Sequence, residues 1–306
     1  MKLRAKDIQH RPITLDPKDT LYDARSMMVR YNISRIVIVQ NKENNNNKVA
    51  KGVITEKDIA RFLYEEAPNR RLNEIRLDEV MSKNLITARE DDGVAYCARL
   101  MLNNEISSVI IVKDDLKRRR QSTTASNLIG VLTKSDLVEA RTRMEPREGK
   151  KALVSEYMTE DVFTVDEDEA LHIVLMLMTD NKISRVVVIK KNRPVGIVTT
   201  HDLLPVGSLF GIGAYGRFWT TQEKEISKRR EQKFIPSGIK NAFLAADVMT
   251  QDPICIPIHS KLTEAAYVMT RNRISGLPIV ESNQDLAGII TKTDVIRSIS
   301  SQYQKA

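Results

Sequence analysis

The chain has 306 residues, of which 42% are apolar and 29% charged, a composition typical of a globular protein of two domains. Its net charge of +8 indicates an attraction to anionic partners. No run of about 18 uncharged apolar residues is present, so no membrane span is predicted, and the N-terminus lacks the apolar segment of a secretory signal. Cys97 and Cys255 lie far apart on apolar stretches. They are interpreted as reduced, buried residues of a cytoplasmic protein.

The first part of the chain predicts a β-α-β-β-α unit. A short strand at 13–15 leads to a capping box of Thr20 and Asp23, and apolar residues then recur at helical spacing at Ala24, Met28 and Tyr31. The unalternated β-branched run at 36–39 is typical of a buried strand. "GVITEKD" at 52–58 then ends a third strand and begins a second helix.

The same unit returns three times. The pattern Gly–apolar–apolar–Thr–x–x–Asp occurs at 52–58, 130–136, 196–202 and 288–294, and a second block occurs at 32–39, 105–112, 182–189 and 273–280. A third block lies upstream of the second, at 79–87, 156–164 and 247–255, with a weaker first copy at 6–14. The separation from a fixed position of the third block to the serine of the second is 26 in every copy, namely Ile8 to Ser34, Met81 to Ser107, Met158 to Ser184 and Met249 to Ser275. A common register in four copies indicates a fourfold internal duplication. The predicted repeats are 1–66, 77–142, 152–206 and 244–303.

Three insertions interrupt the repeats. The polar stretches at 41–48 and 114–127 are predicted as hairpin loops. The segment 207–243 combines glycines, aromatic residues and a basic helix predicted from about Thr221 to Lys233. Its "GIGAYG" is excluded as a phosphate loop because no strand, helix and downstream acidic residue surround it. A packed loop with a polar helix and a docking surface for a partner both remain open.

The four blocks resemble the CBS repeat, which occurs in tandem pairs called Bateman modules. Four copies in one chain are also similar to stand-alone prokaryotic CBS proteins and to the gamma subunit of AMP-activated protein kinase. The resemblance implies a mixed α+β fold in which four β-α-β-β-α CBS repeats pair, 1 with 2 and 3 with 4, into two Bateman modules forming a disc. It also implies AMP, ADP or ATP as a regulatory ligand in the clefts.

The Thr–x–x–Asp pairs are the central candidate residues. One interpretation is a helix capping box, in which the acid reaches back to the N-cap. The other is a ligand grip, because an aspartate can accept hydrogen bonds from a ribose diol and a helix N-terminus attracts phosphate. The resemblance assigns the aspartate to ribose and the threonine to phosphate. We therefore predict nucleotide contacts from Thr55 and Asp58, Thr133 and Asp136, Thr199 and Asp202, and Thr291 and Asp294.

The resemblance implies further contacts. The backbone at Ile33–Ser34, Ile106–Ser107, Ile183–Ser184 and Ile274–Ser275 would face adenine, as would Thr14, Thr87, Thr164 and Cys255. The residue after each serine often carries a basic group toward phosphate. It is Arg35 and Arg185 in repeats 1 and 3, but Ser108 and Gly276 in repeats 2 and 4. Because a guanidinium can clamp a phosphate, unequal occupancy is predicted, against the alternative of exposed surface arginines.

No catalytic or metal-binding pattern is recognised. The histidines have no metal-ligand spacing, and no nucleophile motif is present; they are His10, His172, His201 and His259. We predict an energy-sensing regulatory module without catalytic activity, acting on an unidentified protein. Two alternatives are a nucleic-acid-associated regulator using "KRRR" at 117–120 and "SKRRE" at 227–231, and an assembly scaffold that nucleotide stabilises. A homodimer also remains open.

Overall fold

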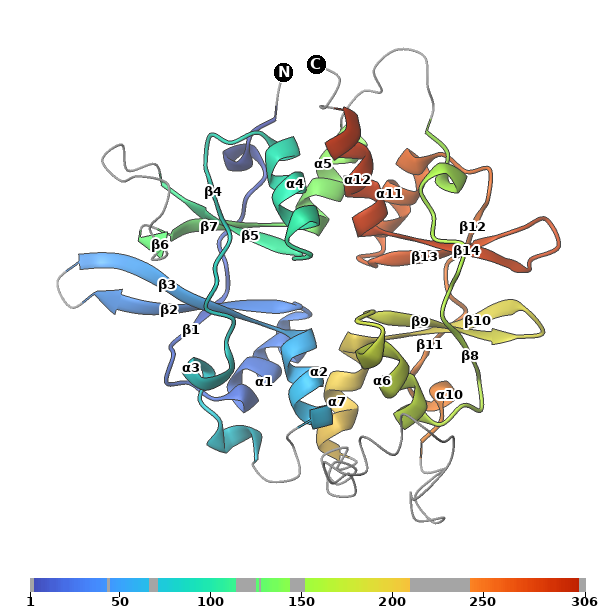
Figure 1. The fold of residues 1–306 in the computed structure, drawn as a ribbon, viewed down its shortest axis with the longest axis horizontal. Coiled ribbons are helices and arrows are strands. Elements are labelled where there is room, and N and C mark those ends of the chain that lie inside the picture. The colour runs from blue at the N-terminus through green and yellow to red at the C-terminus, as the bar shows by residue number, and fades with distance from the viewer. Residues whose placement is uncertain are drawn as a thin grey trace.

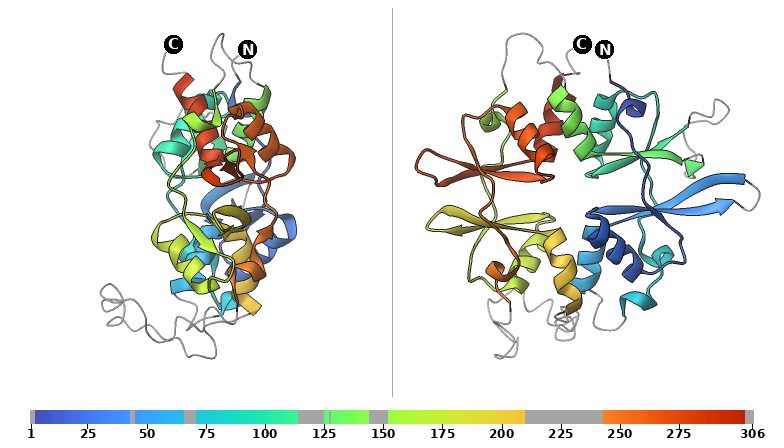
Figure 2. Two further views of the ribbon diagram at one scale, coloured as in Figure 1. Left: turned by 90° about the vertical axis from the view of Figure 1, so that its right-hand side faces the viewer. Right: turned by 180° about the vertical axis from the view of Figure 1, so that it is seen from behind.

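Four α+β repeats surround the centre of a flat disc (Figure 1), which is narrow when seen edge-on (Figure 2). The computed structural model describes residues 3–42, 45–65, 71–113, 125–126, 128–143, 152–209 and 243–302. Repeats 1 and 2 form one half of the disc and repeats 3 and 4 form the other (Figure 1). The predicted fold class, four β-α-β-β-α repeats paired into two modules that form a disc, is confirmed.

Each repeat contains the predicted strands and helices, preceded by short helical turns. Repeat 1 comprises η1 (Ala5–Asp7), β1 (Thr14–Leu15), α1 (Leu21–Tyr31), β2 (Arg35–Lys42), β3 (Asn45–Thr55) and α2 (Glu56–Glu65). Repeat 2 comprises η2 (Leu72–Glu74), α3 (Leu77–Val80), β4 (Thr87–Arg89), α4 (Val94–Asn103), β5 (Ser108–Val112), β6 (Ala125–Ser126), β7 (Leu128–Thr133) and α5 (Lys134–Arg143). Repeat 3 comprises η3 (Val154–Glu156), β8 (Thr164–Asp166), α6 (Leu171–Asp180), β9 (Arg185–Lys190), β10 (Arg193–Thr199) and α7 (Thr200–Leu209). Repeat 4 comprises α10 (Ala245–Val248), β11 (Thr250–Gln251), β12 (Ile256–Pro257), α11 (Leu262–Arg271), β13 (Gly276–Val280), β14 (Leu286–Thr291) and α12 (Lys292–Gln302).

The sheets share one topology. In repeat 1 the short β1 runs parallel to β2, with Thr14 opposite Val37, and β2 runs antiparallel to β3, with Arg35 opposite Thr55. The corresponding strands of the other repeats pair in the same way. The residue after each block serine is therefore directly opposite the motif threonine.

The helix α1 follows from its sequence. Thr20 caps it, and the carboxylate of Asp23 accepts a hydrogen bond from the Thr20 backbone N–H, so the predicted capping box is confirmed. Ala24 and Met28 are fully buried. Tyr31, predicted on the same face, is 48% exposed, because the helix ends there and Asn32 takes the left-handed conformation at φ 50°.

The insertion at 41–48 was predicted as a polar hairpin loop. It does connect two hairpin strands, but most of it is strand and not loop, because β2 continues to Lys42 and β3 begins at Asn45, with Asn41 opposite Lys48. The second insertion supplies β6, which pairs with β3 of repeat 1 through Val49 and Ser126. Alternating backbone hydrogen bonds can extend a hairpin through polar residues without any apolar signal. Residues 114–124 and 210–242 lie outside the described residues, so both interpretations of the 207–243 segment stay predictions.

Crossing segments interlock the repeats of each module. In repeats 2, 3 and 4 the residue after the third-block methionine pairs through its backbone with the other repeat of its module, as Ser82 of repeat 2 does with Val53 of repeat 1. His10 bridges Val131 in the reverse direction, and the equivalent bridges between repeats 3 and 4 are Thr159 to Ile289 and Thr250 to Ile197. This exchange explains why repeats pair as 1 with 2 and 3 with 4.

The crossing segments also explain the motif glycines. A Cβ at Gly52 would lie 2.5 Å from Sδ of Met81, and one at Gly196 would lie 2.2 Å from Sδ of Met249. These contacts leave no room for a side chain at the glycine. The glycine that opens the motif thus serves the pairing of two repeats.

The apolar core is divided unequally among the repeats. Repeats 2 and 4 share one continuous cluster, which includes the fully buried Leu137 of α5 and Ile299 of α12. Repeats 1 and 3 have separate clusters, and Leu204 of α7 is the repeat 3 member that packs into the repeat 1 cluster. Cys97 lies in the shared core, where burial raises the pKa of its thiol to about 12, and both cysteines are free.

Candidate functional site

The four Thr–Asp pairs have the same geometry. In each pair the aspartate Oδ2 accepts one hydrogen bond from the threonine backbone N–H and one from the threonine hydroxyl, at 2.7–2.9 Å. The threonine ends a strand and the aspartate lies in the first turn of the following helix. The capping interpretation is therefore a structural fact in all four repeats. It engages one carboxylate oxygen and leaves Oδ1 for another partner.

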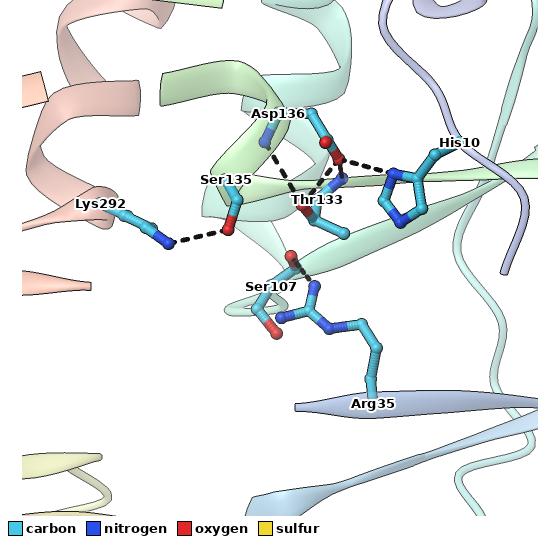
Figure 3. A network of polar contacts seen from close by, with 7 residues as sticks. All are labelled: His10, Arg35, Ser107, Thr133, Ser135, Asp136 and Lys292. Carbon is cyan, nitrogen blue, oxygen red and sulfur yellow. Dashed lines mark hydrogen bonds and ion pairs between the residues drawn. The ribbon is translucent and has the colours of Figure 1, made fainter. Parts of the chain in front are cut away.

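The second partner of the aspartate differs between repeats. Asp58 is 3.4 Å from Arg61, and Asp294 is 3.0 Å from Arg297, each through Oδ1. Asp136 is instead paired through Oδ2 with Nδ1 of His10 at 3.3 Å (Figure 3). Within the part of the chain that the structure describes, no further side chain bonds the carboxylate of Asp202. The four candidate sites are equivalent in backbone and distinct in chemistry.

The block serines lie beside these motifs. The carbonyl of Ser34 accepts the N–H of Glu56, the first residue of α2, at 3.1 Å. The carbonyls of Ser107, Ser184 and Ser275 accept the equivalent N–H groups of Lys134, Thr200 and Lys292. Within each repeat, a backbone hydrogen bond therefore joins the serine of the second block to the Thr–x–x–Asp motif.

The first-strand residues lie one strand further from the motif. Thr14, Thr87 and Thr164 are each opposite the third residue of the adjacent strand, namely Val37, Ile110 and Val187. Cys255 lies directly before β12 and is partly buried, with its Sγ 3.2 Å from the carbonyl of Pro253. The structure places all four beside the strand that follows the block serine.

Arg35 and Arg185 extend into the paired repeat and are partly buried, so the alternative of exposed surface arginines is wrong. The Arg35 guanidinium donates to the carbonyl of Ser107 in repeat 2 and to the hydroxyl of Ser34, the latter at 2.8 Å (Figure 3). Arg185 does the same with Ser275 in repeat 4 and with Ser184. Burial lowers the pKa of each arginine to about 10. Both charges therefore lie beside the sites of repeats 2 and 4.

Gly276 and Ser108 are explained by the same crossing. A Cβ on Gly276 would lie 2.1 Å from Nη1 of Arg185, so a long side chain at this position would compete with the arginine for the same space. Ser108 occupies the matching position opposite Thr133, next to the Ser107 carbonyl that receives Arg35. Each module thus uses one arginine where the repeat pattern offers two positions.

Sequence analysis did not assign His10 to a site. It occupies the position held by Ser82, Thr159 and Thr250 in the other crossing segments, which places it across from repeat 2. Its hydrogen bond with Asp136 raises the pKa of the imidazole. Although burial opposes this, hydrogen bonds from His10 and Thr133 lower the pKa of Asp136. The crossing of chain segments, which the sequence pattern did not reveal, creates this contact.

Two further lysines were also missed. Lys134 donates to the hydroxyl of Thr293 at 2.8 Å, and Lys292 donates to that of Ser135 at 2.8 Å. These reciprocal bonds join α5 of one module to α12 of the other. The signal lay in the variable positions inside the Thr–x–x–Asp motif, where repeats 2 and 4 begin with lysine, repeat 1 with glutamate and repeat 3 with threonine.

The equivalent contact between repeats 1 and 3 is of a different kind. Glu56 of α2 bonds Nδ1 of His201 of α7, and this bond raises the pKa of the histidine. Lys57 reaches the carbonyl of Lys182 at 3.2 Å. This side of the disc centre therefore carries a carboxylate where the other side carries two lysines.

Among the described residues, no three or more His, Cys, Asp or Glu side chains gather in a way that could hold a metal ion. None of the described helices is both long enough and apolar enough to cross a bilayer.

The profile of the CBS domain matches residues 5–65, 77–143, 154–207 and 245–301. The chain belongs to the CBS domain family, and it carries four copies of the domain in two pairs. Family membership supports a regulatory ligand-binding module. The four matches are separated by residues 66–76, 144–153 and 208–244.

Two archaeal proteins are similar to this chain over nearly its full length. MJ1225 of Methanocaldococcus jannaschii is 27% identical over 297 residues, covering 93% of this chain and 94% of that protein. The crystal structure of MJ1225, described as a candidate archaeal homolog of g-AMPK, aligns with a TM-score of 0.72 at 25% identity, over 97% of this chain and all of that one. An uncharacterized conserved protein from Pyrococcus horikoshii shares the fold, with a TM-score of 0.59 at 20% identity and the same coverage.

An enzyme also matches, over part of its length. Inosine-5'-monophosphate dehydrogenase of Thermoplasma acidophilum is 24% identical over 241 residues, or 76% of this chain, but this chain spans only 42% of that enzyme. More than half of the dehydrogenase therefore lies outside the similarity.

Proposed function

We propose that this protein is a regulatory module that binds adenosine nucleotides, AMP, ADP or ATP, between its paired CBS domains and signals their presence to a partner protein. The four Thr–Asp pairs would provide the ribose contacts. The block serines and the first-strand residues would surround the base. The guanidinium groups of Arg35 and Arg185 would receive the phosphates. The family and the full-length similarity to MJ1225 support this proposal.

One observation carries the proposal. In all four repeats an aspartate is held by its own helix cap through Oδ2, so the carboxylate has a fixed direction before any ligand arrives. Its Oδ1 lies outside the cap and can accept a hydrogen bond from a ribose hydroxyl. A charge-assisted bond of this kind contributes roughly 1.5–3 kcal/mol. A fixed acceptor also reduces the ordering that binding must impose.

The sites are proposed to differ in the ligand charge that they favour. Repeats 2 and 4 combine their aspartates with Arg35 or Arg185 and with a lysine at the helix start. Repeat 1 begins its helix with Glu56, which disfavours a phosphate at that place. We therefore infer that phosphorylated ligands occupy the sites of Asp136 and Asp294 first.

The test begins with the ligand that the protein carries through native purification, identified by mass spectrometry. Calorimetric titration of AMP, ADP, ATP and S-adenosylmethionine into the stripped protein then measures affinity. The substitutions Asp58→Asn, Asp136→Asn, Asp202→Asn and Asp294→Asn keep an acceptor for the cap and remove the carboxylate charge. We expect the substitutions in repeats 2 and 4 to weaken AMP binding by about 10-fold or more.

Asp91→Asn is the matched control, because Asp91 pairs with Arg4 and Lys6 on the surface. It should leave the AMP affinity unchanged. If none of the four ligands binds, the proposed function is refuted. Binding that survives all four Asp→Asn substitutions would refute the assignment of the site.

A further inference from the structure

The centre of the disc gathers positive charge from both modules. Arg35 and Lys57 of repeat 1 and Lys134 of repeat 2 belong to one module. Arg185 of repeat 3 and Lys292 of repeat 4 belong to the other. Four of them are partly buried and Lys57 is exposed. All five lie in the central region, where α5 meets α12 and α2 meets α7. Figure 3 shows Lys292 reaching across to Ser135 on the side of the site opposite His10, with Arg35 pointing upward to Ser107.

Among the described residues, no carboxylate contacts any of these five cations directly. Within the described ranges their nitrogen atoms bond only neutral oxygens, which are the carbonyls of Ser107, Ser275 and Lys182 and the hydroxyls of Ser34, Ser184, Thr293 and Ser135. Partly buried cations are ordinarily paired with a carboxylate. A group of unpaired cations with neutral neighbours is suited to receive an anion.

The five charges act on one another across the module boundary. Burial and then the charges of Lys57, Arg35 and Arg185 lower the pKa of Lys134 to about 8. Burial and then the charges of Arg185 and Arg35 lower the pKa of Lys292 to about 8. Each lysine is also influenced by the aspartate of the opposite module, Lys134 by Asp294 and Lys292 by Asp136. The repeat 2 and repeat 4 sites thus share their cations.

We propose that Lys134 and Lys292 are phosphate-binding residues that act across the module interface and couple the site of Asp136 to that of Asp294. This inference deepens the proposed function, on which it rests for the identity of the ligand. A phosphate that enters at repeat 2 would draw Lys292 from Ser135, and one that enters at repeat 4 would draw Lys134 from Thr293. Each event would break a bond that joins α5 to α12, so occupancy of one module would be felt by the other.

The first experiment compares Lys134→Gln and Lys292→Gln with the unaltered protein, using AMP, adenosine and tripolyphosphate as separate calorimetric probes. Each substitution should weaken AMP and tripolyphosphate binding by about 10-fold. Adenosine, which has no phosphate, should bind within about 2-fold of its original affinity. Lys190→Gln is the control, since Lys190 is an exposed residue paired with Glu167.

The second experiment tests the crossing itself. In an Asp294→Asn background, where the repeat 4 site is weakened, Lys292→Gln should still reduce AMP affinity at the remaining repeat 2 site. Thr293→Val removes the hydroxyl that Lys134 bonds but keeps the cation. It should maintain or increase AMP affinity, because it frees the lysine. A merely structural role for the lysine would predict a loss.

Proton uptake provides a readout that packing alone would not change. At about pH 9 lysines with a pKa near 8 are largely neutral, and a bound phosphate should recharge them. A phosphate monoester, with its second pKa near 6, is already fully ionised at that pH. Titrations in two buffers of different ionisation enthalpy should therefore show net proton uptake, which the double variant Lys134→Arg/Lys292→Arg should abolish while retaining AMP binding.

The inference is overturned if AMP and tripolyphosphate bind both Gln variants with unchanged affinity and AMP binding takes up no protons. The proposed function would stand in that case, provided that AMP and adenosine bind. Conversely, lysine-dependent binding of tripolyphosphate by a protein that binds neither AMP nor adenosine would support the phosphate-binding lysines and refute the nucleotide ligand.

Discussion

The two contacts that join the modules at the disc centre differ in kind. Between repeats 2 and 4, helices α5 and α12 share one apolar core and exchange reciprocal bonds from Lys134 and Lys292. Between repeats 1 and 3, helices α2 and α7 are in contact, but the two repeats have separate apolar cores. The contact is made by Leu204, which packs into the repeat 1 core, and by the Glu56–His201 pair. The same repeat thus builds a continuous, positively charged contact on one side and a divided, titratable contact on the other.

This difference suggests a division of labour. Burial of apolar surface across the 2–4 contact stabilises the joined modules without requiring the protonation of any group. The polar 1–3 contact depends on protonation of one histidine and can change with little loss of core packing. A chain that duplicates one unit four times can therefore separate assembly from response by changing a few positions within its motif.

The largest predicted effect comes from removing equivalent core residues on the two sides. Leu137 and Ile59 each follow the motif aspartate and are fully buried. Leu137→Ala and Ile59→Ala should each lower the free energy of unfolding by about 2–5 kcal/mol. Hydrogen exchange should show that Leu137→Ala loosens α12 of the other module as well as α5. Ile59→Ala should leave α6 of repeat 3 protected. Equal spreading from both sites would contradict the divided core.

The motif glycines give an intermediate effect. A Cβ at Gly288 would lie 2.9 Å from the backbone carbonyl of Thr159, whereas the three nearest atoms at Gly196 all belong to the side chain of Met249. Since a methionine can change rotamer more easily than a backbone can move, Gly288→Ala should cost about 1–3 kcal/mol of unfolding free energy. Gly196→Ala should cost less.

Gly93→Ser is the control for both glycine substitutions, because a Cβ at Gly93 meets no atom within 4 Å. Urea unfolding of the three variants gives the order. A greater loss for Gly196→Ala than for Gly288→Ala would show that the methionine contact, and not the backbone, sets the limit.

The smallest effect concerns pH at the 1–3 contact. The hydrogen bond that His201 donates to the Glu56 carboxylate raises the pKa of His201 in the folded protein. Its stabilising contribution is complete below the unfolded pKa of about 6.5 and is lost as pH rises through the higher folded value. Unfolding free energy should therefore decline over that range by less than about 1 kcal/mol, because the pair is partly exposed. His201→Asn should flatten the decline.

His10→Asn provides the comparison within one module, since the pKa of His10 is raised by Asp136 of repeat 2. It should flatten the pH dependence of stability without changing hydrogen exchange at the 1–3 contact. An identical pH slope in the unaltered protein and in His201→Asn would show that the Glu56–His201 pair contributes no pH-dependent stability.

Much of the fold could be predicted from the repeats, since a fixed register of 26 residues and the Thr20–Asp23 capping box report local structure. The predicted capping of all four motifs was also confirmed, while their ligand role stays a proposal. Prediction failed where partners come from another repeat. Arg35 crosses to Ser107, and His10 reaches Asp136, because segments exchange between paired repeats. The residue pattern of one repeat does not indicate which segments exchange with another repeat. Polar strand ends such as that at Asn41 are equally difficult to predict, because they lack an apolar pattern.

The most direct test of this account is the ratio of AMP to adenosine affinity in two double variants. In Asp58→Asn/Asp202→Asn the cation-rich sites of repeats 2 and 4 remain, and AMP should bind at least about 10-fold more tightly than adenosine. In Asp136→Asn/Asp294→Asn the sites beside Glu56 and His201 remain, and the ratio should approach about one. The reverse order, or equal ratios in both variants, would contradict the placement of phosphate at the sites of repeats 2 and 4.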